Sequence, residues 1–262
     1  MKTRLCVALL VVAAASLISV SAWPVSSFSS TGALEARAKD KPKVLYLTHS
    51  AGFKHAVLPF SETTFKEIGD RNGFELTATQ DCSLISKQGL APYKAVVFYT
   101  TGELPISDEQ KAALLDYVKS GHGFVGIHSA TDTFYKWPEY GEMIGGYFDG
   151  HPWHQEVAIK VEDSKQGATK HLGASFKITD EIYQFKNFSR DRVHVLMSLD
   201  VTSVDLTKKG VNRTDKDFAT AWTRDYGKGR VFYTALGHRD EVWKDERFQQ
   251  HLVGGLRWAG RF

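Results

Sequence analysis

The chain has 262 residues, 42% of them hydrophobic and 24% charged, with a formal net charge of +3. This length is sufficient for one large globular domain with a substantial core and no need of disulfide staples. The small net charge gives no electrostatic case for binding nucleic acid or an anionic membrane surface.

The first 22 residues have the pattern of a cleaved signal peptide. Lys2 and Arg4 precede an apolar run over 5–20, and the small residues of 20–22 form a cleavage site. A transmembrane anchor is the alternative, but the run is short for a span of about 20 residues. We therefore expect a secreted or periplasmic protein that has no membrane contact after cleavage.

The region after the predicted signal peptide begins with a flexible linker over 23–42, rich in serine and alanine. A single domain is then expected over 43–262. Of the two cysteines, Cys6 lies in the signal and Cys82 remains alone, so no intramolecular disulfide is expected. Cys82 is interpreted as a packed core thiol in preference to a nucleophile.

The first half of the domain alternates strands and helices. An apolar strand is expected over 43–48, a helix over 59–72, and strands over 74–79 and 95–100. Ser107 and Gln110 then have the spacing of a capping box at the start of a helix that ends near Gly121. Another apolar strand follows over 123–128.

This regular order indicates βαβ units and a doubly wound, mostly parallel sheet with helices on both faces. Beyond residue 134 the pattern is looser. A short helix is expected over 140–148, and a helix with one apolar face ends the chain. The remaining predicted strands, some of them antiparallel edge strands, cover 155–161, 182–185, 193–199, 218–224 and 229–234.

The segment 123–133 passes from a strand through a tight turn to a predicted helix start, which Ser129, Thr131 or Asp132 could cap. Such a turn exposes one side chain at the carboxyl edge of the sheet, where open α/β sheets bind ligands. Here that side chain is His128. The nucleophile elbow of hydrolases has the same geometry but carries serine or cysteine.

Histidines follow three apolar strands: His49, His128 and His238. If these strands are parallel, the three imidazoles share one edge. Two further candidates are His55, in the loop after His49, and His151, in an irregular segment. Imidazole binds divalent metals such as zinc and acts as a general base near neutral pH. Each histidine alone is better explained as structural, but three at strand ends favour a functional site.

Carboxylates and aromatic rings lie in the same predicted loops. Asp132 could exchange protons or hold His128, and it could also simply cap a helix. Asp240 or Glu241 could orient His238, ligate a metal, or complement a helix dipole. Rings in these loops suit stacking on sugars, with core packing as the alternative. The candidates for sugar binding are Phe53, Tyr99, Trp137 and Trp153.

Several separated motifs resemble the ThuA-like family, which is associated with trehalose utilisation. They are Gly52–His55, the run 123–133, His151-Pro152, the segment 221–234, and Gly237-His238. The resemblance covers about 43–260. It implies the flavodoxin-like sheet of class I glutamine amidotransferases, and a role in disaccharide or 3-keto-glycoside metabolism. Those enzymes carry a cysteine nucleophile at the elbow, where this chain has His128.

The leading hypothesis is an exported enzyme that hydrolyses, cleaves or isomerises a small carbohydrate. Its catalytic residues would be His128, Asp132 and His238, and a divalent metal such as zinc would be held by His55, His128, His238 and His151. No nucleotide cofactor is expected, because the sequence lacks a P-loop and a Gly-x-Gly-x-x-Gly helix start.

Two alternatives remain at this point. The first is a non-catalytic carbohydrate-binding module that uses the aromatic loops. The second is an amidase or peptidase of the amidotransferase-like class, for which Ser129 and Cys82 are the available nucleophiles.

Overall fold

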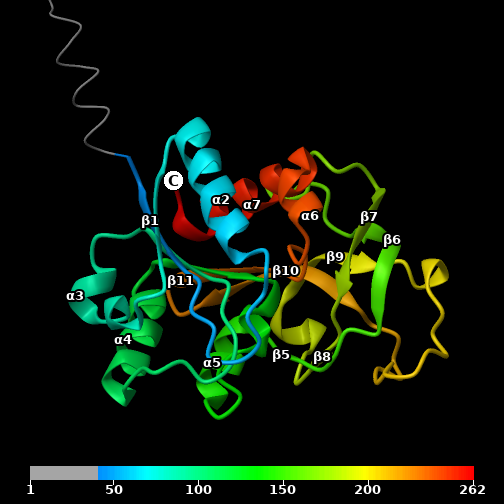
Figure 1. Cartoon of the computed structure of the whole chain (residues 1–262), viewed down its shortest axis with the longest axis horizontal. Coiled ribbons are helices and arrows are strands. Elements are labelled where there is room, and N and C mark those ends of the chain that lie inside the picture. Colours follow the sequence, from blue (N-terminus) through cyan, green and yellow to red (C-terminus); the bar gives the residue numbers. More distant parts are fainter. Residues whose placement is uncertain (1–40) are drawn as a thin grey trace, which may run out of the picture. The chain divides into compact units, whose positions relative to one another are not determined.

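The computed structural model describes residues 41–262, in which nine strands form one sheet in the order β2-β1-β3-β4-β11-β10-β9-β6-β7 (Figure 1). The predicted signal peptide at 1–22 and nearly all of the predicted linker lie outside the described residues. No helix within 41–262 has the length and apolarity needed to cross a membrane.

One half of the sheet is parallel and the other is antiparallel. The parallel strands are β1 (Lys43–Leu47), β2 (Glu75–Thr79), β3 (Ala95–Phe98), β4 (Gly123–Ile127) and β11 (Gly229–Thr234). The antiparallel strands are β6 (Trp153–Val161), β7 (Ser175–Ile182), β9 (His194–Leu199) and β10 (Ala219–Tyr226). β5 (Tyr147–Phe148) and β8 (Phe185–Lys186) pair separately.

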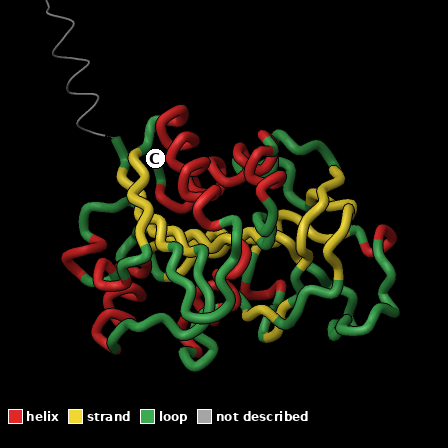
Figure 2. The backbone as a smooth tube through the Cα atoms, viewed as in Figure 1, coloured by secondary structure: helices red, strands yellow, loops and turns green. Residues whose placement is uncertain are grey.

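Helices cover both faces of the parallel strands, which Figure 2 shows edge-on. On one face lie α2 (Leu58–Asn72), α6 (Asp240–Lys244) and α7 (Glu246–Gly260), and on the other α3 (Lys87–Leu90), α4 (Asp108–Lys119) and α5 (Pro138–Ile144). Each layer has its own apolar core. The parallel strands are buried on both sides, and for this reason they are continuous apolar runs in the sequence. The doubly wound fold is thus confirmed.

Local sequence patterns predict the positions of most helices and strands correctly. The capping box of α4 forms, with Ser107 Oγ accepting from the Gln110 N–H and the Gln110 side chain accepting from the Ser107 N–H. The helix expected over 140–148 is wrong in its second half. α5 ends at Ile144 because Gly145 takes a left-handed conformation with φ of 103°, and the chain then enters β5.

The strand expected over 182–185 is also misplaced. β7 begins at Ser175 and ends at Ile182, so it includes the consecutive carboxylates Asp180 and Glu181. Both are buried in the structure. Because the predicted strand begins after them, it does not place these carboxylates at the edge of the sheet.

Candidate functional site

His128 lies directly after β4 with a left-handed backbone, at a φ of 47°. This conformation is uncommon for a residue other than glycine. Two buried hydrogen bonds hold it: His128 Nδ1 donates to the Ala235 carbonyl at 2.7 Å, and the His128 carbonyl accepts from the Tyr233 hydroxyl at 2.7 Å. Residues His128–Asp132 form a 3₁₀ turn without a side-chain cap, so the predicted capping role of this segment is wrong.

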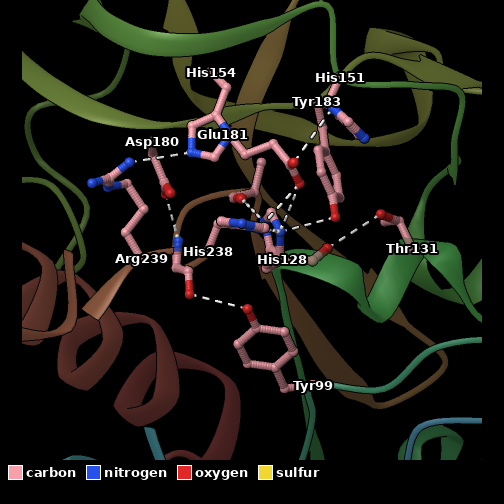
Figure 3. A network of polar contacts seen from close by, with 12 residues as sticks. Tyr99, His128, Thr131, His151, His154, Asp180, Glu181, Tyr183, His238 and Arg239 are labelled. Carbon is pink, nitrogen blue, oxygen red and sulfur yellow. Dashed lines mark hydrogen bonds and ion pairs between the residues drawn. The ribbon is translucent and has the colours of Figure 1, made fainter. Parts of the chain in front are cut away.

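His238 follows the end of β11, and the residue before it, Gly237, is hydrogen-bonded through both its N–H and its carbonyl. The Gly237 N–H donates to Asp180 Oδ2 at 2.7 Å. The Gly237 carbonyl accepts from the Tyr99 hydroxyl at 3.0 Å and from Trp243 Nε1 at 2.9 Å. Figure 3 shows Asp180 and Tyr99 on opposite sides of the backbone that leads to His238. These hydrogen bonds fix the backbone position from which the His238 side chain extends.

Glu181 reaches these histidines from the far edge strand of the sheet. Its Oε2 lies 3.1 Å from His238 Nδ1 and 3.3 Å from His128 Nε2. β7 is five strand positions from β4. In a flat sheet that separation is about 24 Å at roughly 4.8 Å per strand. The antiparallel half of the sheet therefore curls back toward the carboxyl edge of the parallel half, which brings Glu181 beside His128 and His238 (Figure 3).

His55 completes the group from the loop between β1 and α2. Its side chain is buried, and Nδ1 has no hydrogen-bond partner among the described residues. The His55 ring centroid lies 5.0 Å from that of His128 and 5.3 Å from that of His238. Burial, aided by the neighbouring His128 and His238, lowers the pKa of His55 to about 3. The ring is therefore neutral and has a lone pair available.

Within the described part of the chain, His55, His128, Glu181 and His238 form one group suited to holding a metal ion. One ligand atom from each lies within 4.8 Å of all the others. Burial alone would raise the pKa of Glu181, but the neighbouring His128 and His238 hold it well below its usual range. Burial favours the neutral form of His238, yet contact with Glu181 raises its pKa overall.

The rim of the group carries two further histidines. His151 is half exposed, with Nδ1 3.4 Å from Glu181 Oε1, and its ring stacks on Phe148. The His154 ring lies 5.0 Å from the His238 ring, and Arg239 contacts its Nε2 at 3.4 Å. His151, predicted as a metal ligand, is therefore linked to the group through Glu181 but does not belong to it.

Other predicted polar residues do not belong to the group. His49 Nδ1 bonds the Gln80 carbonyl at 2.9 Å. Asp132, predicted to be catalytic, accepts from the Tyr135 hydroxyl at 2.5 Å and does not hold His128. Burial raises the Asp132 pKa. Glu241 pairs with Arg239 at 3.2 Å, so Glu181 takes the place predicted for Asp240 or Glu241 beside His238.

Of the four aromatic residues predicted to bind sugar, one is exposed and three are buried. Phe53 is 66% exposed and lies edge-on to His55, with ring centroids 4.9 Å apart. Trp153 is fully buried in the core, where Nε1 donates to the Asp205 carbonyl. Trp137 is buried among aromatic rings, and the buried Tyr99 is committed to Gly237. These last three rings offer no exposed face for a sugar, which corrects their predicted role.

Sequence reasoning missed Glu181, Asp180 and Tyr183. The Tyr183 hydroxyl lies 2.9 Å from His128 Nε2, and its ring packs on the His128 ring at 4.2 Å. The available signal was a pair of carboxylates in a segment otherwise suited to a buried strand. Buried carboxylates need partners, and the histidines at the strand ends supply them.

The matches to known proteins agree with this architecture. The family model described as "ThuA: Trehalose utilisation" matches residues 43–259. The chain belongs to the ThuA family. A crystal structure of a ThuA-like protein from Bacteroides uniformis shares 28% identity with it, covers 84% of this chain and 92% of its own, and has a TM-score of 0.71.

A second ThuA-like protein, from Parabacteroides merdae, shares 20% identity over 84% of this chain and 90% of its own, with a TM-score of 0.67. A GMP synthase protein from Thermoplasma acidophilum, at 9% identity and a TM-score of 0.50, covers 84% and 94%. It shows the amidotransferase-like fold alone. No curated protein matches this sequence.

This ThuA-family chain lacks the features of an amidase at the elbow. Cys82 is buried, and burial raises the pKa of its thiol to about 11, so it is not a thiolate nucleophile at neutral pH. Ser129 Oγ has no hydrogen-bond partner among residues 41–262, and hence no base to activate it. The titratable group that the structure does assemble at this edge consists of three histidines and Glu181.

Proposed function

We propose that this protein is an exported enzyme that modifies a disaccharide or 3-keto-glycoside, using a divalent metal ion such as zinc held by His55, His128, Glu181 and His238. The observation that carries the proposal is His55. A buried imidazole whose Nδ1 lacks a partner is costly, and here three other ligand atoms converge on the same point.

The spacing of the ligand atoms fits a metal ion. His238 Nδ1 lies 3.1 Å from Glu181 Oε2 and 3.2 Å from His128 Nε2. The distance from His128 Nε2 to Glu181 Oε2 is 3.3 Å. Zinc bonds of about 2.0–2.1 Å in tetrahedral geometry place neighbouring ligand atoms about 3.3 Å apart. A set of three nitrogens and one carboxylate oxygen suits zinc or another borderline divalent ion.

The surroundings also prepare His128 for this role. Its Nδ1 donates to the Ala235 carbonyl, which leaves Nε2, 3.2 Å from His238 Nδ1 and 3.3 Å from Glu181 Oε2, as the nitrogen that would bind the ion. A hydrogen bond from the second ring nitrogen to a carbonyl is the usual support of a metal-bound histidine.

When bound, such an ion would polarise a sugar oxygen and lower the pKa of a water molecule. The chain's own residues would do the rest. His151 lies at the exposed rim and touches Glu181 Oε1, so it is placed to carry protons between the buried group and solvent. Phe53 offers an exposed ring beside His55, on which the apolar face of a sugar can stack.

Metal content tests the proposal directly. Elemental analysis of the purified protein should find about one divalent ion per chain, removable with a chelator and restored by zinc. His55→Ala should lower zinc affinity by more than about tenfold, because it removes a ligand without breaking a hydrogen bond at Nδ1. The matched control is His194→Ala, an exposed histidine paired with Asp163. Wild-type protein that binds no ion would contradict the metal assignment.

The enzymatic part needs its own test. Zinc-loaded protein should convert a member of a panel of disaccharides and their 3-keto derivatives, with a new product visible by mass spectrometry. Sugar binding without any product, unaffected by His55→Ala but lost in Phe53→Ala, would identify the protein as a carbohydrate-binding module instead.

Export is proposed from the sequence of residues 1–22. Expression of the full chain in a secreting host should give periplasmic or extracellular protein whose first residue is Trp23. Protein that stays inside the cell with residues 1–22 attached would contradict this.

A further inference from the structure

The Nε2 atom of a neutral His128 ring has a single lone pair, so it can accept one hydrogen bond or bind one metal ion, but not both. A ring that is to bind a metal through Nε2 must keep its proton on Nδ1, where the Ala235 carbonyl can only accept, and in that form Nε2 is an acceptor. The atoms around Nε2 are the Tyr183 hydroxyl at 2.9 Å, His238 Nδ1 at 3.2 Å and Glu181 Oε2 at 3.3 Å. One of these must supply the proton that Nε2 accepts.

Tyr183 is the group that supplies it. A carboxylate has no proton to donate, and His238 Nδ1 is closer to Glu181 Oε2, at 3.1 Å, than to His128. The Tyr183 hydroxyl is the nearest of the three atoms. Its O–H therefore takes the same lone pair that the proposed metal site requires from His128.

Tyr183 cannot leave the site when it loses this acceptor. The side chain is almost fully buried, and its ring centroid lies 4.2 Å from that of His128 and 4.4 Å from that of Phe148. A buried hydroxyl without a partner is unfavourable. Once Nε2 is engaged elsewhere, the O–H must turn to another acceptor within reach of the group.

We infer that Tyr183 is a hydrogen-bond switch in the site: its O–H occupies His128 Nε2 until a metal ion takes that lone pair, and it is then released to donate to an oxygen atom of a bound ligand. The inference rests on the proposed metal-binding function. It makes Tyr183 a competitor of the metal as well as a donor to the ligand.

The competition gives an unusual expectation for Tyr183→Phe. This variant keeps the ring and its packing but removes the O–H, so zinc no longer has to displace a hydrogen bond. Zinc affinity, measured by calorimetric titration of chelator-treated protein, should rise about fivefold, the effect of one ordinary hydrogen bond. A tyrosine that merely braced His128 would have the opposite effect, because its loss would loosen a ligand.

Tyr140→Phe is the matched control. Tyr140 is also fully buried and donates to a backbone carbonyl, that of Ala130, at 2.7 Å. Its removal should leave zinc affinity unchanged. The near-ultraviolet tyrosine difference spectrum gives a second readout. Zinc should produce a signal in wild type and Tyr140→Phe that is absent from Tyr183→Phe.

The outcomes separate this inference from the proposal beneath it. If wild-type protein binds no zinc, the metal site itself is wrong, and the switch falls with it. If wild type binds zinc but Tyr183→Phe binds it equally or more weakly, the metal site stands and the switch is overturned. Tighter binding together with loss of the tyrosine signal supports both.

Discussion

His128→Asn is expected to lower zinc affinity by more than about 100-fold, beyond the 10- to 100-fold typical for loss of a supporting partner, and to reduce turnover to background. Asparagine tolerates the left-handed backbone of position 128 better than most residues. Its side-chain amide can also replace the donor to the Ala235 carbonyl. The variant removes Nε2, the atom that faces the group.

The measurements are a zinc titration and the melting temperature of the same preparation. We expect the melting temperature of chelator-treated His128→Asn to stay within a few degrees of wild type, which separates loss of the site from loss of the fold. The control is His122→Asn, a histidine whose Nδ1 contacts the Tyr117 carbonyl. Zinc binding as tight as in wild type would exclude His128 as a ligand.

Glu181→Gln is expected to have the second large effect, because it removes the negative charge of the group while keeping its shape. Zinc affinity should fall at least tenfold, since a neutral amide is a poor ligand. The pKa of His238 should also fall. Without the Glu181 carboxylate, burial and the positive charge of Arg239 favour the neutral ring, and the charge of Asp180 alone opposes them.

The same variant should show a defined pH dependence of stability. The raised pKa of His238 stabilises the fold below its unfolded value of 6.5, and this contribution is lost as pH rises through the folded pKa. The lowered pKa of Glu181 stabilises the fold above its unfolded value of 4.5, and this contribution is lost as pH falls through the folded pKa. Both contributions are present between those two values.

Urea denaturation of chelator-treated protein checks this expectation. The loss of unfolding free energy in Glu181→Gln should be largest near about pH 5.5 and smaller near about pH 8.5. Glu156→Gln, an exposed carboxylate on the neighbouring strand that pairs with Lys177, should show no such window. An equal loss at both pH values would mean that Glu181 and His238 are not coupled as described.

The sequence is most informative where local patterns decide the structure. His128 and His238 can be placed at one edge because each follows a continuous apolar run, and such runs become buried parallel strands. His55 can be added because its loop follows the first of those strands. These three predicted residues do meet in the structure.

The sequence is least informative where a contact depends on how distant strands pack. Glu181 reaches the site only because the antiparallel half of the sheet bends, and no local pattern encodes that bend. Trp153 is an example of a predicted site residue that strand pairing removes from the site. A tryptophan beside two histidines is typical of a binding ring, but the face on which it lies is set by strand pairing, and it belongs to the core.

The bend also changes what the edge strand depends on. β7 has a single hydrogen-bonded neighbour, β6, and a strand in that position is ordinarily among the first to fray. Glu181 gives it a second attachment, through side chains, to the ends of β4 and β11. An ion held at this point would act as a staple between β7 and β4, which are five positions apart in the sheet. Binding of the ion would then complete the site and fix β7 to the parallel half of the sheet at the same time.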